Sequence, residues 1–198
     1  FVPPADLEKR IRAVTSQILE TAPYVDGQAL LQTPSASRGV LIKAARFADE
    51  ARVSRIGEYL ESGTYPAEGE PGILIGNVLA GLLNVKVGGT VHLYSPVRRK
   101  PTLLTVSGIY HSGMYDYDAN LGYLSLATGQ EMMGLGGTGE AGEAGGTGAR
   151  VTGIAVKFDN PESALRWERQ LQAAVGYERY VRSWRDMNAT LFGALKLE

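Results

Sequence analysis

An imidazole and two carboxylates lie close together in the chain, at His111, Asp116 and Asp118. Such a set could serve a carboxylate-dependent hydrolase, because acid–base catalysis uses an imidazole or a pair of carboxylates at a controlled distance. The pattern is weak, since Ser107 and Ser112 lack the GxSxG context of an activated nucleophile. We therefore expect no catalytic residues, and a hydrolase is the least favoured function.

Two further motifs match known binding sites only in part. Residues 116–120 (DYDAN) begin like a calcium loop, but Leu121 stands where a glycine must turn and Ala127 where a bidentate glutamate belongs. Residues 134–139 (GLGGTG) match GxGxxG, yet a dinucleotide site follows a strand and opens a helix, whereas residues 127–133 before this motif have a helical pattern. We expect no cofactor and no metal site.

A short basic run between two prolines is the remaining candidate for binding. Arg98, Arg99 and Lys100 lie between Pro96 and Pro101, and no aromatic residue is interleaved with them. The run suits an ordinary charged hairpin tip, and it also suits a contact with a protein partner, because a proline-flanked loop presents its charges with little entropy to lose. The candidate partner-binding residues are Arg98, Arg99, Lys100 and Pro101.

Composition excludes several classes of function. The chain of 198 residues has 44% hydrophobic and 21% charged residues and a formal net charge of -1, so it suits a folded domain and offers no positive field for nucleic acid. The absence of cysteine excludes disulfides, thiolate metal sites and cysteine nucleophiles. No apolar run reaches the roughly 20 residues that cross a bilayer. Because the chain begins at Phe1 without a signal sequence, we expect a processed chain or an excised domain.

Periodicity predicts helical and stranded flanks around a β-rich middle. The apolar spacing of Leu7, Ile11, Val14 and Ile18 predicts a first helix that Pro23 stops. The other predicted helices cover residues 50–60, 77–83, 160–174 and 186–198, and Asn160 caps the helix of residues 160–174. The predicted strands are residues 24–32, 38–46, 73–76, 90–94, 103–110, 121–126, 151–158 and 177–184, and the first two form a hairpin. Residues 63–72 are a connector, and the glycine-rich residues 134–149 form a loop.

Several phrases, in order, resemble the extracytoplasmic domain of the lipoprotein-releasing ABC transporter permeases LolC and LolE, within the wider MacB and FtsX-like group. Residues 72–80 (GILIGNVLA), 83–93 (LNVKVGGTVHL) and 95–96 (SP) are similar to the longest family motif. Residues 113–118 (GMYDYD) resemble a second motif. A third is matched by Trp184, Asn188 and residues 191–195. The likeness covers nearly the full chain.

The resemblance implies an α+β fold with a discontinuous porter-like part and an inserted, β-rich, sabre-like part. The porter-like part would comprise residues 1–70 and 150–198, and the sabre-like part residues 71–149 with the glycine-rich loop 134–149. Such a domain lies in the periplasm, is joined to transmembrane helices of an inner-membrane protein, and has no catalysis of its own. ATP hydrolysis would take place in a separate cytoplasmic subunit.

The resemblance also implies partners. They are a LolD-type ATPase and a partner permease through the membrane part, lipoprotein cargo, and a LolA-type chaperone that receives the lipoprotein; we expect no nucleic acid, and a monomer for the isolated domain. LolC-type chains carry a protruding hairpin that grips the chaperone, but here only residues 97–101 separate Pro96 from the next strand. A LolC-like, LolE-like or undifferentiated role therefore stays open, as does a MacB-like efflux or signalling permease.

Overall fold

The computed structural model covers the chain and describes residues 4–136 and 149–187. It is a mixed α and β structure that divides into two compact units. The terminal unit comprises Phe1–Thr21 and Val156–Glu198, and the barrel unit comprises Ala22–Ala155. The predicted fold class, a discontinuous α+β outer part enclosing a β-rich part, is confirmed.

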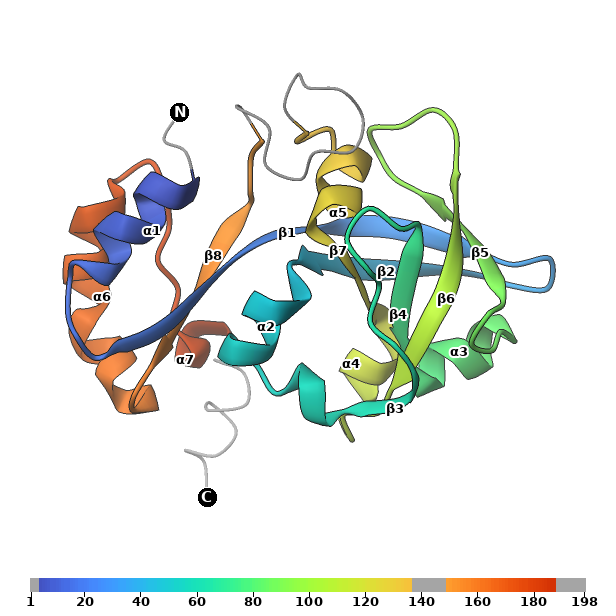
Figure 1. Cartoon of the computed structure of the whole chain (residues 1–198), viewed down its shortest axis with the longest axis horizontal. Helices are drawn as coiled ribbons and strands as arrows, with labels where there is room; N and C mark the ends of the chain where they lie inside the picture. Colours follow the sequence, from blue (N-terminus) through green and yellow to red (C-terminus); the bar gives the residue numbers. More distant parts are fainter. Residues whose placement is uncertain (1–3, 137–148, 188–198) are drawn as a thin grey trace. The chain divides into compact units, whose positions relative to one another are not determined.

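The barrel unit is a closed ring of six strands (Figure 1). Neighbours pair in the order β2, β7, β4, β6, β5 and β1, and the additional pairing of β1 with β2 closes the ring. Closure leaves none of these six strands as a free edge for unwanted pairing. The bounds are β1 Ile18–Gln32, β2 Ser37–Ala45, β4 Gly72–Gly76, β5 Thr90–Tyr94, β6 Thr102–Tyr110 and β7 Leu121–Ser125. Outside the ring, β3 (Leu60–Gly63) pairs with β6, and β8 (Gly153–Phe158) follows β1 in the sheet order.

Side chains fill the inside of the ring. Alternate positions of each strand point inward, so Leu31, Val91, Leu93, Leu104 and Val106 are at most 1% exposed. The helix α3 (Asn77–Leu83) adds Leu79 and Leu83 to the same cluster, and α5 (Leu126–Met132) adds Met132. The interior of the ring is therefore a packed core.

Local sequence signals locate most of the ring elements. The bounds of α3 and β5 agree with prediction, and β1 and β2 form the expected antiparallel hairpin through the turn at residues 33–36. The predicted helix over residues 50–60 is instead α2 (Phe47–Val53) followed by a 3-10 turn, η1 (Ile56–Glu58). The motif at residues 113–118 enters a short helix, α4 (Tyr115–Asn120), that precedes β7.

Two predictions near the chain ends were wrong. The first helix, α1 (Pro4–Arg12), ends well before Pro23, and β1 already starts at Ile18. Pro23 lies one residue before the pairing of β1 with β2, which begins at Tyr24, so that pairing does not need an amide donor from the proline. Residues 177–183 are irregular and not a strand, and the short helix α7 (Trp184–Met187) follows them. Most of the predicted helix over residues 186–198 lies outside the described residues, as does the centre of the glycine-rich loop.

The terminal unit contains α1, α6 (Pro161–Val175) and α7. The Asn160 side chain accepts a hydrogen bond from the Glu162 amide at 3.0 Å, so it caps α6 as predicted. α1 packs against α6, and the indole of Trp167 on α6 donates to the Gln17 side chain at 2.6 Å. Within residues 4–136 and 149–187, no helix is both long and apolar enough to span a membrane.

The unit boundaries fall within β1 and β8. The sequence placed residues 22–70 with the outer part, whereas their strands β1 and β2 are members of the ring. The assignment of the two units to porter-like and sabre-like subdomains stays a prediction.

Candidate interaction surface

The loop between β5 and β6 presents the basic run at one end of the barrel unit. Ser95 is buried at the base of this loop, where its hydroxyl donates to the Met132 carbonyl at 2.7 Å and accepts from the Arg98 amide at 3.2 Å. The first of these bonds ties the loop to α5, and the second closes a turn within the loop. A proline-flanked loop with an anchored base keeps its conformation when a partner binds, which lowers the entropic cost of association.

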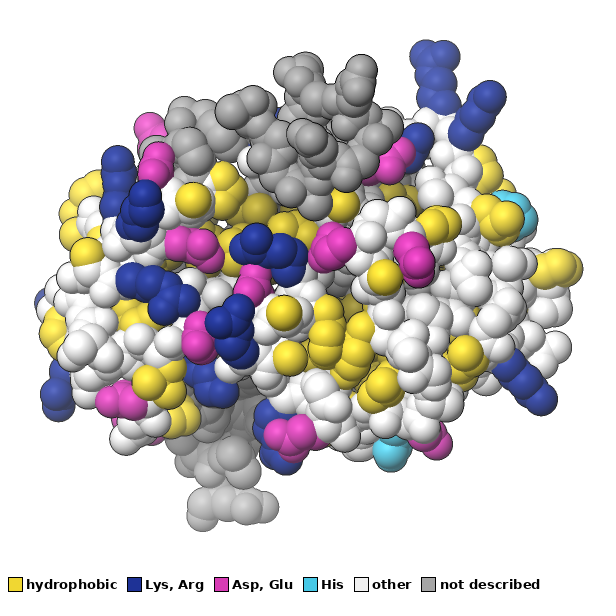
Figure 2. Space-filling view, in the orientation of Figure 1, with side chains coloured by type: hydrophobic (Ala, Val, Ile, Leu, Met, Phe, Trp, Pro, Cys, Tyr) yellow, Lys and Arg dark blue, Asp and Glu magenta, His cyan; other side chains and the backbone are white. Residues whose placement is uncertain are grey.

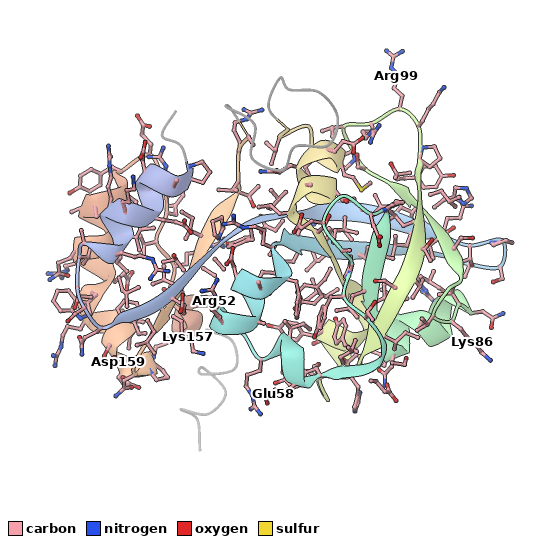
Figure 3. All side chains as sticks on the ribbon, viewed as in Figure 1. Arg52, Glu58, Lys86, Arg99, Lys157 and Asp159 are labelled. Carbon is pink, nitrogen blue, oxygen red and sulfur yellow. The ribbon has the colours of Figure 1, made fainter. Side chains whose placement is uncertain are left out.

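The three cations of this loop differ in their surroundings. Arg98 forms an exposed ion pair with Glu131 on α5, Nη1 to Oε1 at 2.7 Å, which contributes little to stability. Arg99 and Lys100 are exposed and make no ion pair with any residue in the described part of the chain. Lys and Arg side chains project beyond the surrounding surface at this loop (Figure 2), and Arg99 points away from the ring (Figure 3). Arg99 and Lys100 are therefore exposed cations at this end of the barrel unit.

An apolar stripe crosses the outer wall of the ring beside this loop. Leu30 of β1 is paired with Tyr94 of β5, and His92 of β5 is paired with Leu103 of β6. Tyr94 and Leu103 are thus diagonal neighbours, as are Leu30 and Leu41 across the β1–β2 pair, where Gly39 lies opposite Leu30. We call Leu41, Leu30, Tyr94 and Leu103 the outer stripe.

The members of the outer stripe are well exposed for apolar side chains. Leu103 is 53% exposed, Leu41 52%, Leu30 40% and Tyr94 39%. Contiguous exposed apolar side chains beside a charged rim are typical of protein interaction sites. No sequence motif includes this stripe. Its signal is adjacent apolar residues such as Leu30–Leu31 and Leu103–Leu104, because only one of two neighbours in a strand can point inward.

Asp118 holds a turn and is fully committed to hydrogen bonds. It is 1% exposed, and its Oδ1 accepts from the Ser112 amide at 2.9 Å and the Ser112 hydroxyl at 2.7 Å. Its Oδ2 accepts from the Gly113 amide at 3.2 Å and lies 3.1 Å from His111 Nδ1. This arrangement orders residues 111–114, a structural use of the carboxylate.

Asp116 does not join Asp118 in a shared site. The two acids lie on α4, not on a strand, and Asp116 is exposed while Asp118 is buried. Among the residues whose positions are described, no group of three His, Cys, Asp or Glu side chains could hold a metal ion. The structure thus does not bring Asp116 and Asp118 together as an acid–base pair.

An ion pair with a buried carboxylate lies near the C-terminal end of β2. Lys43 Nζ lies 2.7 Å from Glu50 Oε1, and the Glu50 side chain is 2% exposed. Burial raises the pKa of Tyr123, a neighbour of this pair, and the Glu50 charge raises it further. The cavity lined by Glu50, Tyr65 and Tyr123 has a volume of about 10 Å³, enough for about one water molecule.

Sequence comparison shows which proteins this chain is similar to. It is 28% identical over 196 residues to the lipoprotein-releasing system transmembrane protein LolC of Xylella fastidiosa strain 9a5c, covering 92% of this chain and 43% of the relative. It is also 28% identical over 190 residues to LolE of Haemophilus influenzae, covering 90% of this chain and 42% of the relative. The resemblance to LolC and LolE is confirmed. The chain spans less than half the length of these relatives, and no family model matches it.

Two solved structures share the fold. The extracellular domain of the noncanonical ABC-type transporter YknZ from Gram-positive bacteria has a TM-score of 0.58 and 11% identity, covering 87% of this chain and 83% of that one. The periplasmic region of MacB from Actinobacillus actinomycetemcomitans has a TM-score of 0.56 and 14% identity, covering 88% of this chain and 75% of that one. The fold is therefore that of a MacB-like periplasmic domain.

Proposed function

We propose that the chain is the periplasmic domain of an inner-membrane ABC transporter permease that helps to release outer-membrane lipoproteins. The observation that carries this proposal is the match to LolC and LolE through 92% and 90% of the chain. In this role the domain binds partners and transmits motion, while ATP is hydrolysed in a separate LolD-type subunit. The domain itself has no catalytic role.

The proposed docking site for a LolA-type chaperone is the outer stripe together with Arg98, Arg99, Lys100 and Pro101. The stripe supplies apolar area for the centre of an interface, and the loop supplies cations for its rim. Apolar area gives affinity that changes little with salt, whereas rim charges act mainly on the association rate and are screened within about 8 Å at physiological ionic strength. The two parts of the site therefore have different salt signatures.

Calorimetric titration of the chain with the LolA-type chaperone of its own source, at low and at physiological salt, tests the docking site. Arg99→Ala with Lys100→Ala should weaken binding about threefold to tenfold at low salt and less at physiological salt. Leu103→Gln should weaken it about tenfold at both, since an apolar side chain of this size contributes about 1.5 kcal/mol or more when buried.

Lys86→Ala and Val87→Ser are matched controls. Both residues are exposed on the barrel unit between α3 and β5, and Lys86 lies well apart from Arg99 in Figure 3. Neither control should change the affinity. An absence of saturable binding, or equal losses in the controls, would contradict the docking site. Failure of the whole permease with its ATPase to release lipoproteins from proteoliposomes would contradict the function itself.

A further inference from the structure

The loop between α6 and α7 displays two aromatic rings in an unusual way. Tyr177 is 88% exposed and Tyr180 is 91% exposed, so neither ring packs on the terminal unit. Tyrosines as exposed as these leave nearly all of their apolar ring area in contact with water.

The backbone that carries the rings is nevertheless held firmly. The Gln172 side-chain amide on α6 donates from Nε2 to the Gly176 carbonyl at 3.0 Å and to the Arg179 carbonyl at 2.6 Å. Its Oε1 accepts from the Val181 amide at 3.1 Å. One side chain thus clamps the loop at three points, and the rings are held outward on an ordered backbone.

Arginines alternate with the two tyrosines. Arg182 is exposed and makes no ion pair with any other described residue. Arg179 uses Nη1 to donate to the Val175 carbonyl at 2.9 Å, which leaves further guanidinium donors unused. Glu178 is the single acid between Tyr177 and Arg182, so this stretch has an excess of one positive charge. The clamped loop therefore offers aromatic rings and guanidinium groups on one short segment.

We propose that this loop, which we call the Tyr–Arg loop (residues 177–182), docks onto a bilayer surface that contains anionic phospholipid. Tyrosine rings are favoured at the headgroup level, where the ring is apolar and the hydroxyl stays hydrated. Guanidinium groups pair with lipid phosphates, and each cation near an anionic surface favours binding. Glu178 and Arg179 separate the two rings in the sequence, so the loop lacks the contiguous apolar patch that is typical of protein interaction sites.

Flotation of the chain with vesicles tests the proposal independently of any chaperone. The chain should bind vesicles of phosphatidylcholine mixed with phosphatidylglycerol, and bind less to phosphatidylcholine alone. Arg182→Gln should lower the partition coefficient about fivefold, the equivalent of about 1 kcal/mol for one cation at an anionic surface. Tyr177→Ser with Tyr180→Ser should lower it further. Tyr115→Ser with Tyr117→Ser, which changes two exposed tyrosines of α4, is the matched control and should have no effect.

A site-specific probe separates insertion from general adsorption. The chain has no cysteine, so Tyr180→Cys and Tyr117→Cys each create a unique site for an environment-sensitive fluorophore. The label at position 180 should shift to shorter wavelength with anionic vesicles, and the label at position 117 should not. Absence of vesicle binding, or a shift that is equal at both positions, would overturn the proposal.

Discussion

At the scale of single residues, the most informative side chains are two tyrosines that burial protects from ionisation. Burial raises the pKa of Tyr110 well above its usual range, and the Tyr110 hydroxyl donates to the Tyr117 and Leu121 carbonyls at 2.9 and 3.0 Å. Burial also raises the pKa of Tyr123, and the nearby Glu50 charge adds to this effect. Tyr123 makes no hydrogen bond through its hydroxyl to any residue that the structure describes, so it can be changed with less disturbance.

We predict that Tyr123→Phe makes the chain less sensitive to alkaline pH. In the unfolded chain a tyrosine ionises near pH 10, whereas the folded state holds Tyr123 neutral to higher pH. Above about pH 10 the unfolded state binds fewer protons than the folded state, so the free energy of unfolding falls by up to about 1.4 kcal/mol per pH unit for each such group. Tyr123→Phe should remove the part of this fall in the free energy of unfolding that Tyr123 causes. Urea unfolding from about pH 8 to about pH 11 measures the slope.

Tyr115→Phe is the control, because the Tyr115 side chain is 67% exposed and packs little. It should leave the alkaline slope at the value of the unaltered chain. An equal slope for Tyr123→Phe and the unaltered chain would show that Tyr123 does not carry the effect.

At the scale of elements, a close approach of backbones sets the position of α4 beside the start of α3. Gly76 ends β4 and precedes α3, and a Cβ atom at this position would lie only 2.5 Å from the Asp118 Cα and closer still to the Asp118 carbonyl oxygen. Asp118 is the residue that orders the turn at 111–114, so it cannot retreat without loss of those hydrogen bonds. Position 76 therefore requires glycine, because a side chain there would clash with the Asp118 backbone.

We predict that Gly76→Ala destabilises the fold by about 1–3 kcal/mol or more, the usual cost of overpacking a core. Gly81→Ala is the matched change within α3, where a Cβ would meet nothing within 4 Å. It should be neutral or stabilise by about 0.5–1 kcal/mol, since alanine is the better helix former. Denaturant unfolding of both variants measures the difference, and equal stabilities would contradict the packing argument.

The same elements show what the sequence could and could not predict. Local sequence signals predicted the helix of residues 77–83 and the hairpin at residues 33–36, because the residues that specify each of them lie within it. The start of β1 was missed because the apolar spacing through Ile18 also fits a helix, and pairing with β8, which is distant in the sequence, decides the outcome. The sequence also predicted the loop of residues 95–101 as the tip of a hairpin. The outer stripe beside it depends on register between β1, β5 and β6, which no local pattern specifies.

At the scale of the whole molecule, the ring and its core are complete within the barrel unit. The pairings of β1 with β2 and β5 involve residues from Tyr24 onward. All other ring pairings lie between Leu41 and Ser125. The main hydrophobic cluster is also drawn from residues 25–151. The pairing of β1 with β2 therefore closes the ring without help from the α1 and α6 helices.

We predict that residues 22–155 fold alone, because a closed ring with its own core needs no further partner strand. The fragment should unfold cooperatively in urea, and amides of β4 and β6 should exchange as slowly as in the full chain. α1 and α6 form a smaller packed pair, so in the full chain their amides should exchange faster than those of β4 and β6. A fragment without cooperative unfolding would show that the terminal unit is needed to close the ring. A folded fragment would also let chaperone docking at residues 98–101 and vesicle binding at residues 177–182 be measured on separate pieces, since only the first site lies within it.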